Sequence, residues 1–395
     1  MSSSPLQGIR VLELTHVISG SVAGMLLGDL GAQVIKVERP KVGEFYREEA
    51  LKNENGVSVV FPSYNRNKKS ITLNLKAPGA KDIIKRLAAE CDIMVENYRP
   101  GVLDKMGIGY ENLKEINPGL VMVSISGFGQ TGPYASKPAY DMTISAVSGF
   151  MSMNGPTGQP TKNGPAVSDF LSGVYGCLSA IAALRHREQT GEGQHVDIAM
   201  MDCGMSILDA FFAQYRFTGA EPTCSGNRRE NYAPVNAYKT ADGCIYISAT
   251  LNKHWEALTA TMNRRDLFDD PANATGTLRK DHEEELERIV ADWARGYDTN
   301  QLVSILDEAG VPCAPVQGIA KVMQDEHVKA RQSIMEFDYP GLGSYPVTAF
   351  VPKFSTIEVP TKRAPLLGED NQEIYCQLMG YSQEEYEAML SNGVI

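Results

Sequence analysis

Short apolar segments alternate with helical segments over the first 130 residues, and this alternation constrains the fold more than any other feature. Strands that are separated by helices are joined by right-handed crossovers, which produce a mainly parallel sheet with helices on both faces. An α/β fold of this kind binds ligands at the carboxyl ends of its strands. The predicted strands cover 9–14, 33–39, 70–75, 92–98 and 120–129, and the predicted helices cover 21–32, 80–91 and 110–119.

The character of the sequence changes near residue 220, which indicates a second domain. Residues 234–250 contain two short strands around an Ala-Asp-Gly turn, and helices are predicted at 254–262 and 286–297. We therefore expect a small α+β domain at 225–325 after a large domain that begins within 1–224. Elsewhere the sequence predicts two long helices within 141–205, an extended segment at 344–359, and helices at 371–381 and 382–390.

Charge and composition exclude several classes of protein. The net charge of −11 argues against a nucleic-acid surface, because phosphate binding needs clustered cations. The longest uncharged apolar run, 170–184, is shorter than the roughly 18 residues that a membrane span requires. The N-terminal residues lack the pattern of a signal peptide. The seven cysteines are scattered and the six histidines lack ligand spacing, so we expect a cytoplasmic protein with reduced thiols and no structural metal.

Nucleotide-binding motifs are missing from the sequence. The nearest glycine cluster, Gly24, Gly28 and Gly31, lies inside a predicted helix and does not match the G-x-G-x-x-G spacing of dinucleotide-binding folds. No Walker loop is present either. The sequence therefore predicts neither a nicotinamide enzyme nor an ATP-dependent one.

A single carboxylate, Asp169, stands at the start of a long stretch of small and apolar residues that contains no further charge before Arg185. The common role of such a residue is to cap a helix, since a side-chain oxygen accepts the free N–H groups of the first turn. Ser168 and Asp169 both qualify as caps. Catalysis by Asp169 is the rarer alternative, and the two roles are not fully exclusive.

A series of segments resembles the family III CoA-transferases, the group that includes formyl-CoA and carnitine CoA-transferases. The resemblance implies a Rossmann-like large domain built from both chain ends, with 326–395 as the connector and the C-terminal part that returns to it. It also implies a small α+β domain in the middle and a homodimer whose chains interlock. The segments occur in the order THVISG, VIKVER, NKKSITLNLK, VENYRPGVLDKMGIGYENLKEINP, SISGFGQTGP, KPAYD, SDFLSG, TGEGQHVDIAM and RAPLLGED.

The same resemblance implies that Asp169 is the catalytic nucleophile. A carboxylate that attacks an acyl-CoA thioester forms a mixed anhydride and then an aspartyl-CoA thioester, so one difficult exchange becomes several easier ones. The free energy of the thioester is kept throughout. Coenzyme A is then the thioester substrate, and no metal, NAD or ATP is required.

Further site residues follow from the resemblance. Tyr140 and Asp141 correspond to the acyl pocket, whereas His16, in the loop after the first strand, is expected to be structural. The partners implied are an acyl-CoA, a carboxylic acid and a second copy of the chain, with no nucleic acid and no membrane. The CoA-binding residues implied are Ile18, Ser19, Arg39, Leu73, Asn97, Tyr98, Lys105 and Lys137.

The sequence departs from the formyl-CoA transferases in two places. Those enzymes carry a glycine run where this chain reads CSGNRRENYAPVNAY, and they carry a glutamine at the position of Ile18. Formyl and oxalate specificity are therefore disfavoured. Four residues of that stretch either line an acid-binding pocket or form an exposed turn: Arg228, Arg229, Asn231 and Tyr232.

Two other functions remain open at this point. An α-methylacyl-CoA racemase would share the fold, but it uses a histidine and an aspartate as acid and base. This chain has Tyr140 before Asp141 and no histidine between His16 and His186. A tyrosine with a pKa of about 10 is a poor base at neutral pH. A non-catalytic CoA-binding subunit would need no nucleophile at Asp169 at all.

Overall fold

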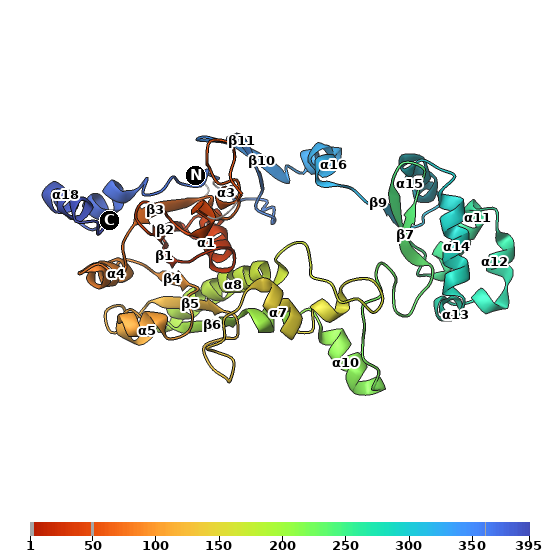
Figure 1. The fold of residues 1–395 in the computed structure, drawn as a ribbon, viewed down its shortest axis with the longest axis horizontal. Helices are drawn as coiled ribbons and strands as arrows, with labels where there is room; N and C mark the ends of the chain where they lie inside the picture. Colours follow the sequence, from red (N-terminus) through yellow and green to blue (C-terminus); the bar gives the residue numbers. More distant parts are fainter. Residues whose placement is uncertain (1–3, 49–50, 360) are drawn as a thin grey trace. The chain divides into compact units, whose positions relative to one another are not determined.

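The computed structural model describes residues 4–48, 51–359 and 361–395, and it divides into two compact units (Figure 1). The large unit consists of Met1–Phe150, Asn163–Phe217 and Lys329–Ile395, and the small unit consists of Met151–Lys162 and Thr218–Val328. The sequence predicts residues 151–162 in the large domain. In the structure they group with the small unit.

A six-stranded parallel sheet forms the centre of the large unit, which confirms the predicted α/β fold. The strand order is β3-β2-β1-β4-β5-β6. Leu12 at the middle of the sheet pairs with Ile35 on one side and with Met94 on the other. The strands are β1 (Arg10–Leu14), β2 (Gln33–Glu38), β3 (Lys68–Thr72), β4 (Ile93–Glu96), β5 (Val121–Ser126) and β6 (His195–Ala199).

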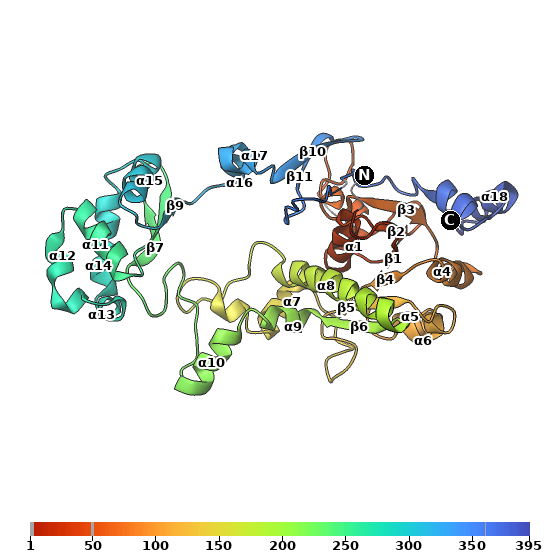
Figure 2. The same ribbon diagram turned by 180° about the vertical axis from the view of Figure 1, so that it is seen from behind.

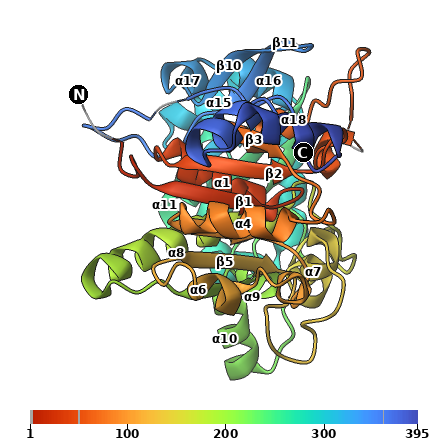
Figure 3. The ribbon, with the colours of Figure 1, turned by 90° about the vertical axis from the view of Figure 1, so that its left-hand side faces the viewer.

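Helices cover both faces of this sheet because its strands are apolar on both sides. Leu12 and Leu14 pack on one face with α4 (Ala80–Ala89) and the C-terminal segment, and α4 lies in front of the strands in Figure 3. Val11 packs on the opposite face with α1 (Ser19–Asp29) and α8 (Val167–Thr190), and Figure 2 shows α8 lying along β5 and β6. Continuous apolar strands are typical of parallel sheets buried on both faces.

Glycines in α1 and α8 allow close contacts in this layer. A Cβ atom at Gly24 would lie 1.8 Å from Glu13 Oε2, and one at Gly173 would lie 2.6 Å from Val22 Cβ. The glycines of α1 that lack the dinucleotide spacing therefore serve packing, since only a residue without a side chain fits there.

The helices between residues 141 and 205 differ from the prediction of two long ones. Only α8 is long, with 24 residues, and α7 (Asp141–Val147) and α9 (Met200–Met205) are short. By length and composition alone α8 could cross a membrane, because its 24 residues extend beyond the apolar run of 170–184 at both ends. This is weak evidence, since α8 packs against α1 and β5 as a core helix does.

Residues 370–375 close the outer edge of the sheet. The amide of Ser70 donates to Asp370 Oδ2 at 2.8 Å, and the amide of Thr72 donates to Asn371 Oδ1 at 2.8 Å. Tyr375 Oη donates to the carbonyl of Thr72 at 2.8 Å. The exposed backbone groups of edge strand β3 are thereby paired, which blocks pairing with other chains.

The remaining elements of the large unit are short. The segment predicted to be extended, 344–359, contributes only its first part to a hairpin, and the helices predicted near the C-terminus are confirmed. These elements are α2 (Phe45–Glu48), α3 (Phe61–Asn65), α5 (Val102–Met106), α6 (Tyr110–Lys114), α10 (Asp209–Thr218), β10 (Ile334–Tyr339), β11 (Gly343–Thr348), the π-helical turn η3 (Glu373–Leu378) and α18 (Gln383–Ser391).

The small unit has its own core around an antiparallel sheet of order β7-β8-β9. Trp255, Leu258 and Val290 are buried in it. The two predicted strands and the two predicted helices are confirmed as β7, β8, α11 and α14. Its elements are η1 (Met151–Met153), β7 (Val235–Lys239), β8 (Cys244–Ser248), α11 (Asn252–Thr261), α12 (Arg265–Asp269), η2 (Pro271–Asn273), α13 (Gly276–Asp281), α14 (Glu283–Ala294), α15 (Thr299–Glu308), β9 (Cys313–Pro315) and α16 (Ile319–Gln324), with α17 (Glu326–Ala330) at the junction.

Candidate functional site

A groove of about 1300 Å³ lies in the large unit at the carboxyl ends of β1, β2, β3, β4 and β5. The chain leaves β1 toward β2 and leaves β4 toward β5, so the two loops diverge and open a crevice between them. The start of α8 completes the lining. The predicted site residues that line the groove are Ile18, Ser19, Arg39, Leu73, Asn97, Tyr98, Lys137, Tyr140, Asp141 and Asp169.

Asn97 joins the two diverging loops. Its Oδ1 accepts the amide of His16 at 2.9 Å, and its Nδ2 donates to the carbonyl of His16 at 2.8 Å and to Ser19 Oγ at 3.1 Å. The His16 ring meets Tyr98 edge to face with the ring centroids 5.0 Å apart. Burial, with help from Lys36, lowers the pKa of His16 to about 4, so this side chain is neutral at physiological pH. These contacts agree with a structural histidine.

The position of Asp169 is not that of a helix cap. The cap residue of α8 is Ala166, and the carboxylate that accepts the free N–H groups belongs to Asp141. Asp141 Oδ1 lies 2.8 Å from the amide of Ser168 and 3.2 Å from the amide of Asp169. The expectation that Ser168 or Asp169 caps the helix is therefore wrong, because a residue from α7 already fills that role.

The carboxylate of Asp169 does not bind the free N–H groups of α8, because Asp141 already accepts them. Within the described part of the chain it makes no hydrogen bond and no ion pair. Burial and the nearby Asp141 carboxylate raise the pKa of Asp169 to about 7. A carboxylate that is poorly stabilised in its ionised form is a stronger base and nucleophile than one in water.

Asp141 and Tyr140 differ in their surroundings although they are neighbours. Asp141 is buried and is fixed by the α8 amides, whereas the side chain of Tyr140 is 73% exposed where it lines the groove. The backbone amide of Tyr140 donates to Thr143 Oγ1 at 3.0 Å, which fixes the start of α7.

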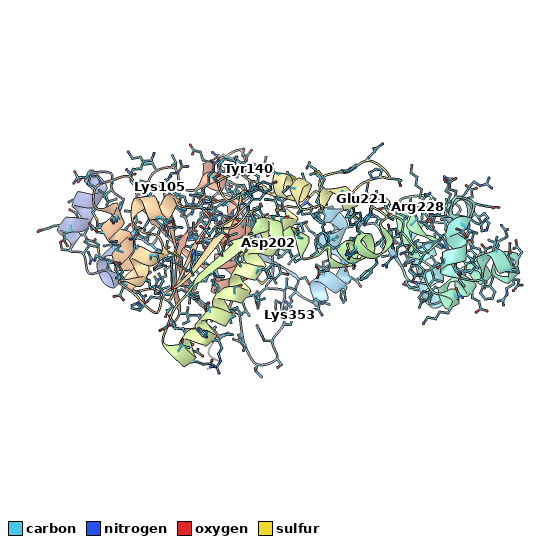
Figure 4. All side chains as sticks on the ribbon, turned by 90° about the horizontal axis from the view of Figure 1, so that it is seen from below. Lys105, Tyr140, Asp202, Glu221, Arg228 and Lys353 are labelled. Carbon is cyan, nitrogen blue, oxygen red and sulfur yellow. The ribbon has the colours of Figure 1, made fainter. Side chains whose placement is uncertain are left out.

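The predicted cationic residues are distributed unequally around the groove. Arg39 lines it with a side chain that is 59% exposed and donates from Nε to the carbonyl of Gly43 at 3.1 Å. Lys137 also lines it, and its Nζ lies 3.6 Å from the ring centroid of Tyr134. Lys105 is exposed on α5, where Figure 4 labels it, and does not line the groove, although Met106 next to it does.

The four residues near 230 belong to the small unit. Arg228, which Figure 4 labels, lies 3.7 Å from Glu283, and the carbonyl of Arg229 accepts from Lys280 Nζ at 2.8 Å. Tyr232 is 41% exposed. Both contacts lie within the small unit itself.

A buried ion cluster next to the groove was missed by sequence reasoning. Lys36 Nζ and Lys68 Nζ lie 2.9 and 3.0 Å from Glu13 Oε1, and all three side chains are buried. Glu38 forms a two-point ion pair with Arg47, at 2.7 and 2.9 Å. The signal was present in the sequence, since Glu13 and Lys36 are charged residues inside apolar strands, but no pattern shows which charges pair. The buried ion cluster contains three carboxylates and three cations: Glu13, Glu38, Glu44, Lys36, Arg47 and Lys68.

The charges of the cluster compensate one another. Burial alone would raise the pKa of Glu13, but Lys36 and Lys68 outweigh it, and the pKa is lowered. Burial lowers the pKa of Lys68 to about 8, with Lys36 as a second cause. Buried charges persist only where they are paired in this way. The part of the chain that the structure describes contains no group of three or more His, Cys, Asp or Glu side chains arranged to hold a metal ion.

The comparisons of this chain with known proteins agree on one family. The profile of the family described as CoA-transferase family III matches residues 6–371. The succinyl-CoA–D-citramalate CoA-transferase of Chloroflexus aurantiacus is 36% identical over 99% of this chain and 98% of its own length. The succinyl-CoA:glutarate CoA-transferase of Mus musculus is 35% identical over 100% of this chain and 91% of its own length. A crystal structure of a CAIB/BAIF family protein from Brucella suis shares 33% identity and superimposes with a TM-score of 0.86, covering 96% of this chain and 100% of that one.

Proposed function

The chain belongs to CoA-transferase family III, and on that premise we propose that it transfers CoA from an acyl-CoA thioester to a free carboxylic acid through Asp169. The observation that carries this proposal is the carboxylate of Asp169, which faces the groove without a hydrogen-bond partner among the described residues. If Asp169 only capped a helix, its side-chain oxygens would accept backbone N–H groups, as Asp141 Oδ1 does.

The proposed reaction keeps the acyl group activated throughout, as a thioester or as an anhydride, so no further energy source is needed. The Asp169 carboxylate attacks the thioester carbonyl, the C–S bond breaks, and CoA leaves as a thiolate beside a mixed anhydride. The thiolate attacks the Asp169 acyl carbon, which releases the donor acid and leaves an aspartyl-CoA thioester. The acceptor carboxylate then repeats both steps in reverse order and leaves with CoA. The raised pKa of Asp169 supports this role, because it strengthens the nucleophile.

The groove supplies the proposed CoA-binding residues. Asn97 holds His16 of the loop after β1 and Ser19 at the start of α1. Arg39 stands at the end of β2, where its side chain is 59% exposed and its Nη2 lies 3.6 Å from Glu48 Oε2, a partner that a phosphate would replace. A guanidinium group pairs well with phosphate oxygens. We extend the proposal to Leu73, Tyr98 and Lys137, which line the same groove, and not to Lys105, which does not. Tyr140 and Asp141 are proposed to border the acyl group.

The relatives point to a substrate class. The two relatives described above are named for succinyl-CoA as donor and for citramalate or glutarate as acceptor, and both acceptors are compact dicarboxylic acids. We propose the same class for this chain: succinyl-CoA as the donor and a compact dicarboxylic acid as the acceptor. Formyl-CoA stays disfavoured because Ile18 offers no polar side chain to the groove.

The assembly proposed is an interlocked homodimer in the cytoplasm. An apolar stripe on α8 supports a second copy as partner: Phe170, Val174 and Leu178 follow one another every four residues and are 43%, 39% and 59% exposed. Residues at this spacing share one face of a helix, and an apolar face of this kind marks an interaction surface.

The test of the function is the variant Asp169→Asn, with Asp202→Asn on α9 as the matched control. Transfer from succinyl-CoA to dicarboxylic acids should fall roughly 10³-fold or more in the first variant and stay near wild type in the second. Hydroxylamine added after succinyl-CoA should modify the wild-type peptide that contains Asp169. Wild-type turnover in Asp169→Asn, with deamidation excluded by mass, would remove Asp169 from the reaction.

A further inference from the structure

Val17, in the loop after β1, has a backbone conformation that is rare for its residue type. Its φ angle is +62°, in the left-handed region that β-branched residues avoid. The residue lines the groove together with His16 and Ile18. A strained conformation of this kind persists only where surrounding contacts enforce it. The contact that enforces it is therefore of functional interest.

Glu44 makes that contact. The amide of Val17 donates to Glu44 Oε2 at 3.0 Å, and Glu44 is 1% exposed. Glu44 is itself held in place, since its amide donates to Glu38 Oε2 at 3.2 Å and Glu38 is fixed by Arg47. Gly43, with φ of +75°, makes room for this arrangement, because a Cβ atom there would lie 2.5 Å from Arg47 Cδ.

The conformation of Val17 sends its side chain into an apolar wall beside Asp169. Val17, Tyr46, Tyr64 and Ala166 pack around Ile18, Val22 and Met25, and Ala166 is the cap residue of the helix that carries Asp169. Burial raises the pKa of both tyrosines, and the Asp169 carboxylate adds to the rise, which places this carboxylate near both phenols.

We propose that Glu44 is a positioning residue for the transfer reaction: its carboxylate holds Val17 in the left-handed conformation and so keeps the apolar wall closed against Asp169. This inference rests on the proposed function of Asp169. The groups that face Asp169 are the Asp141 carboxylate from α7 and the phenols of Tyr46 from α2 and Tyr64 from α3. Glu44 acts on the reaction through Val17, because closure of the wall excludes water from Asp169. Glu44 also contributes to the raised pKa of Tyr46, after burial, Tyr64 and Asp169.

Two variants of Glu44 separate the hydrogen bond from the charge. Glu44→Gln keeps an oxygen that can accept the Val17 amide but removes the negative charge, and Glu44→Ala removes both. Asp29→Asn is the control, because Asp29 is a buried carboxylate paired with Arg66, outside the groove. Two quantities are measured on each protein: the pH at which kcat/KM reaches half its maximum, and hydrogen exchange of a peptide that contains Val17.

Glu44→Ala should increase exchange at Val17 about tenfold and lower the acid midpoint of kcat/KM by about one pH unit, because water reaches Asp169. Its kcat should fall more than its KM for CoA rises. Glu44→Gln should keep exchange close to wild type and should move the acid midpoint much less than Glu44→Ala does, because the Val17 contact remains. Val17→Ala, which trims the wall but leaves the Glu44 contact, should lower the acid midpoint with unchanged exchange. This second variant keeps the test valid if Glu44→Ala does not fold.

The inference is overturned if Glu44→Ala and Glu44→Gln change both quantities equally, if Asp29→Asn moves the acid midpoint as far, or if Val17→Ala leaves it unchanged. Failure of the proposed function looks different. In that case Asp169→Asn stays active and no acid midpoint belongs to Asp169, while the exchange measurement still reports whether Glu44 holds the loop.

Discussion

Asp169 combines a charge with surroundings that penalise it. Burial removes much of its water, and the charged group that adds to the rise of its pKa is another carboxylate, Asp141. Asp141 itself is compensated by two backbone amides of α8, and Asp169 is not. The ionised Asp169 therefore lowers the free energy of unfolding, which is the trade-off expected at a reactive group.

Replacing Asp169 by Asn should make the protein more stable above neutral pH. The pKa is raised from 3.8 to about 7, so the folded state binds the proton more tightly than the unfolded chain. Wild-type stability is therefore undiminished below pH 4, falls as the pH rises toward 7, and stays lower above it. The amide cannot ionise and avoids this loss. Allowing for partial exposure, the variant should gain about 1–3 kcal/mol at pH 8 and almost nothing at pH 4.

Urea unfolding of both proteins at pH 4 and pH 8 measures this difference. Asp202→Asn controls for the change of a surface charge. An equal stability difference at both pH values would show that the Asp169 carboxyl titrates as an ordinary exposed group.

At the scale of elements, contact between α1 and α8 positions Asp169. Gly173 lies one helical turn after Asp169, and a Cβ atom there would meet Val22 Cβ at 2.6 Å and the carbonyl of Ser19 at 2.7 Å. Ser19 is the first residue of α1, and its hydroxyl accepts a hydrogen bond from Asn97 in the groove. The positions of Asp169 and of Ser19 are thus set by one close helix contact.

Gly173→Ala should therefore destabilise the fold by about 1–3 kcal/mol, since overpacking against backbone has no easy relief. Gly176→Ala on the same helix is the control, because the atom nearest to its new Cβ is Ile125 Cδ1 at 3.1 Å, the end of a flexible side chain, and Ala23 Cβ stays 3.3 Å away. The control should cost much less, helped by the better helix propensity of alanine. Thermal unfolding compares the two variants, and similar losses for both would contradict the packing argument.

The sequence predicted the elements that have a strong pattern and missed those without one. Five buried strands were recognisable as apolar runs, whereas β6 at the sheet edge alternates in exposure and was read only as a family motif. The cap of α8 was also missed, because Asp141 comes from 27 residues away in the sequence. Local patterns do not report contacts over such distances.

The candidate site was predictable to a similar degree. Asp169 and most of the groove residues came from the resemblance, and the structure brings them together. The buried ion cluster could not be predicted from the sequence. The pairing of Glu13 with Lys36 and Lys68 depends on the order and register of three strands. Glu44 had no signal at all, because it lies outside any strand or helix.

At the scale of the whole molecule, the exposed stripe on α8 and the proposed interlocked dimer make a prediction about exchange. Chains that are threaded through one another can separate only by unfolding. Mixed dimers should therefore not form within hours when two differently tagged preparations are combined under native conditions, although each should have the mass of a dimer. Native mass spectrometry reads both properties.

Refolding the two preparations together from denaturant is the positive control and should yield mixed dimers. Rapid mixing without denaturant would argue against threading, and a monomeric mass would argue against the dimer itself.

The closure of β3 by residues 370–375 has a consequence for biosynthesis. The partners of the Ser70 and Thr72 amides lie 300 and 299 residues later in the sequence. At a synthesis rate of roughly 5–20 residues per second, about 15–60 s pass between the appearance of β3 and that of Asp370 and Asn371. During this interval the edge of the nascent sheet is open. A strand made early in synthesis is thus completed by residues that are made about 300 positions later.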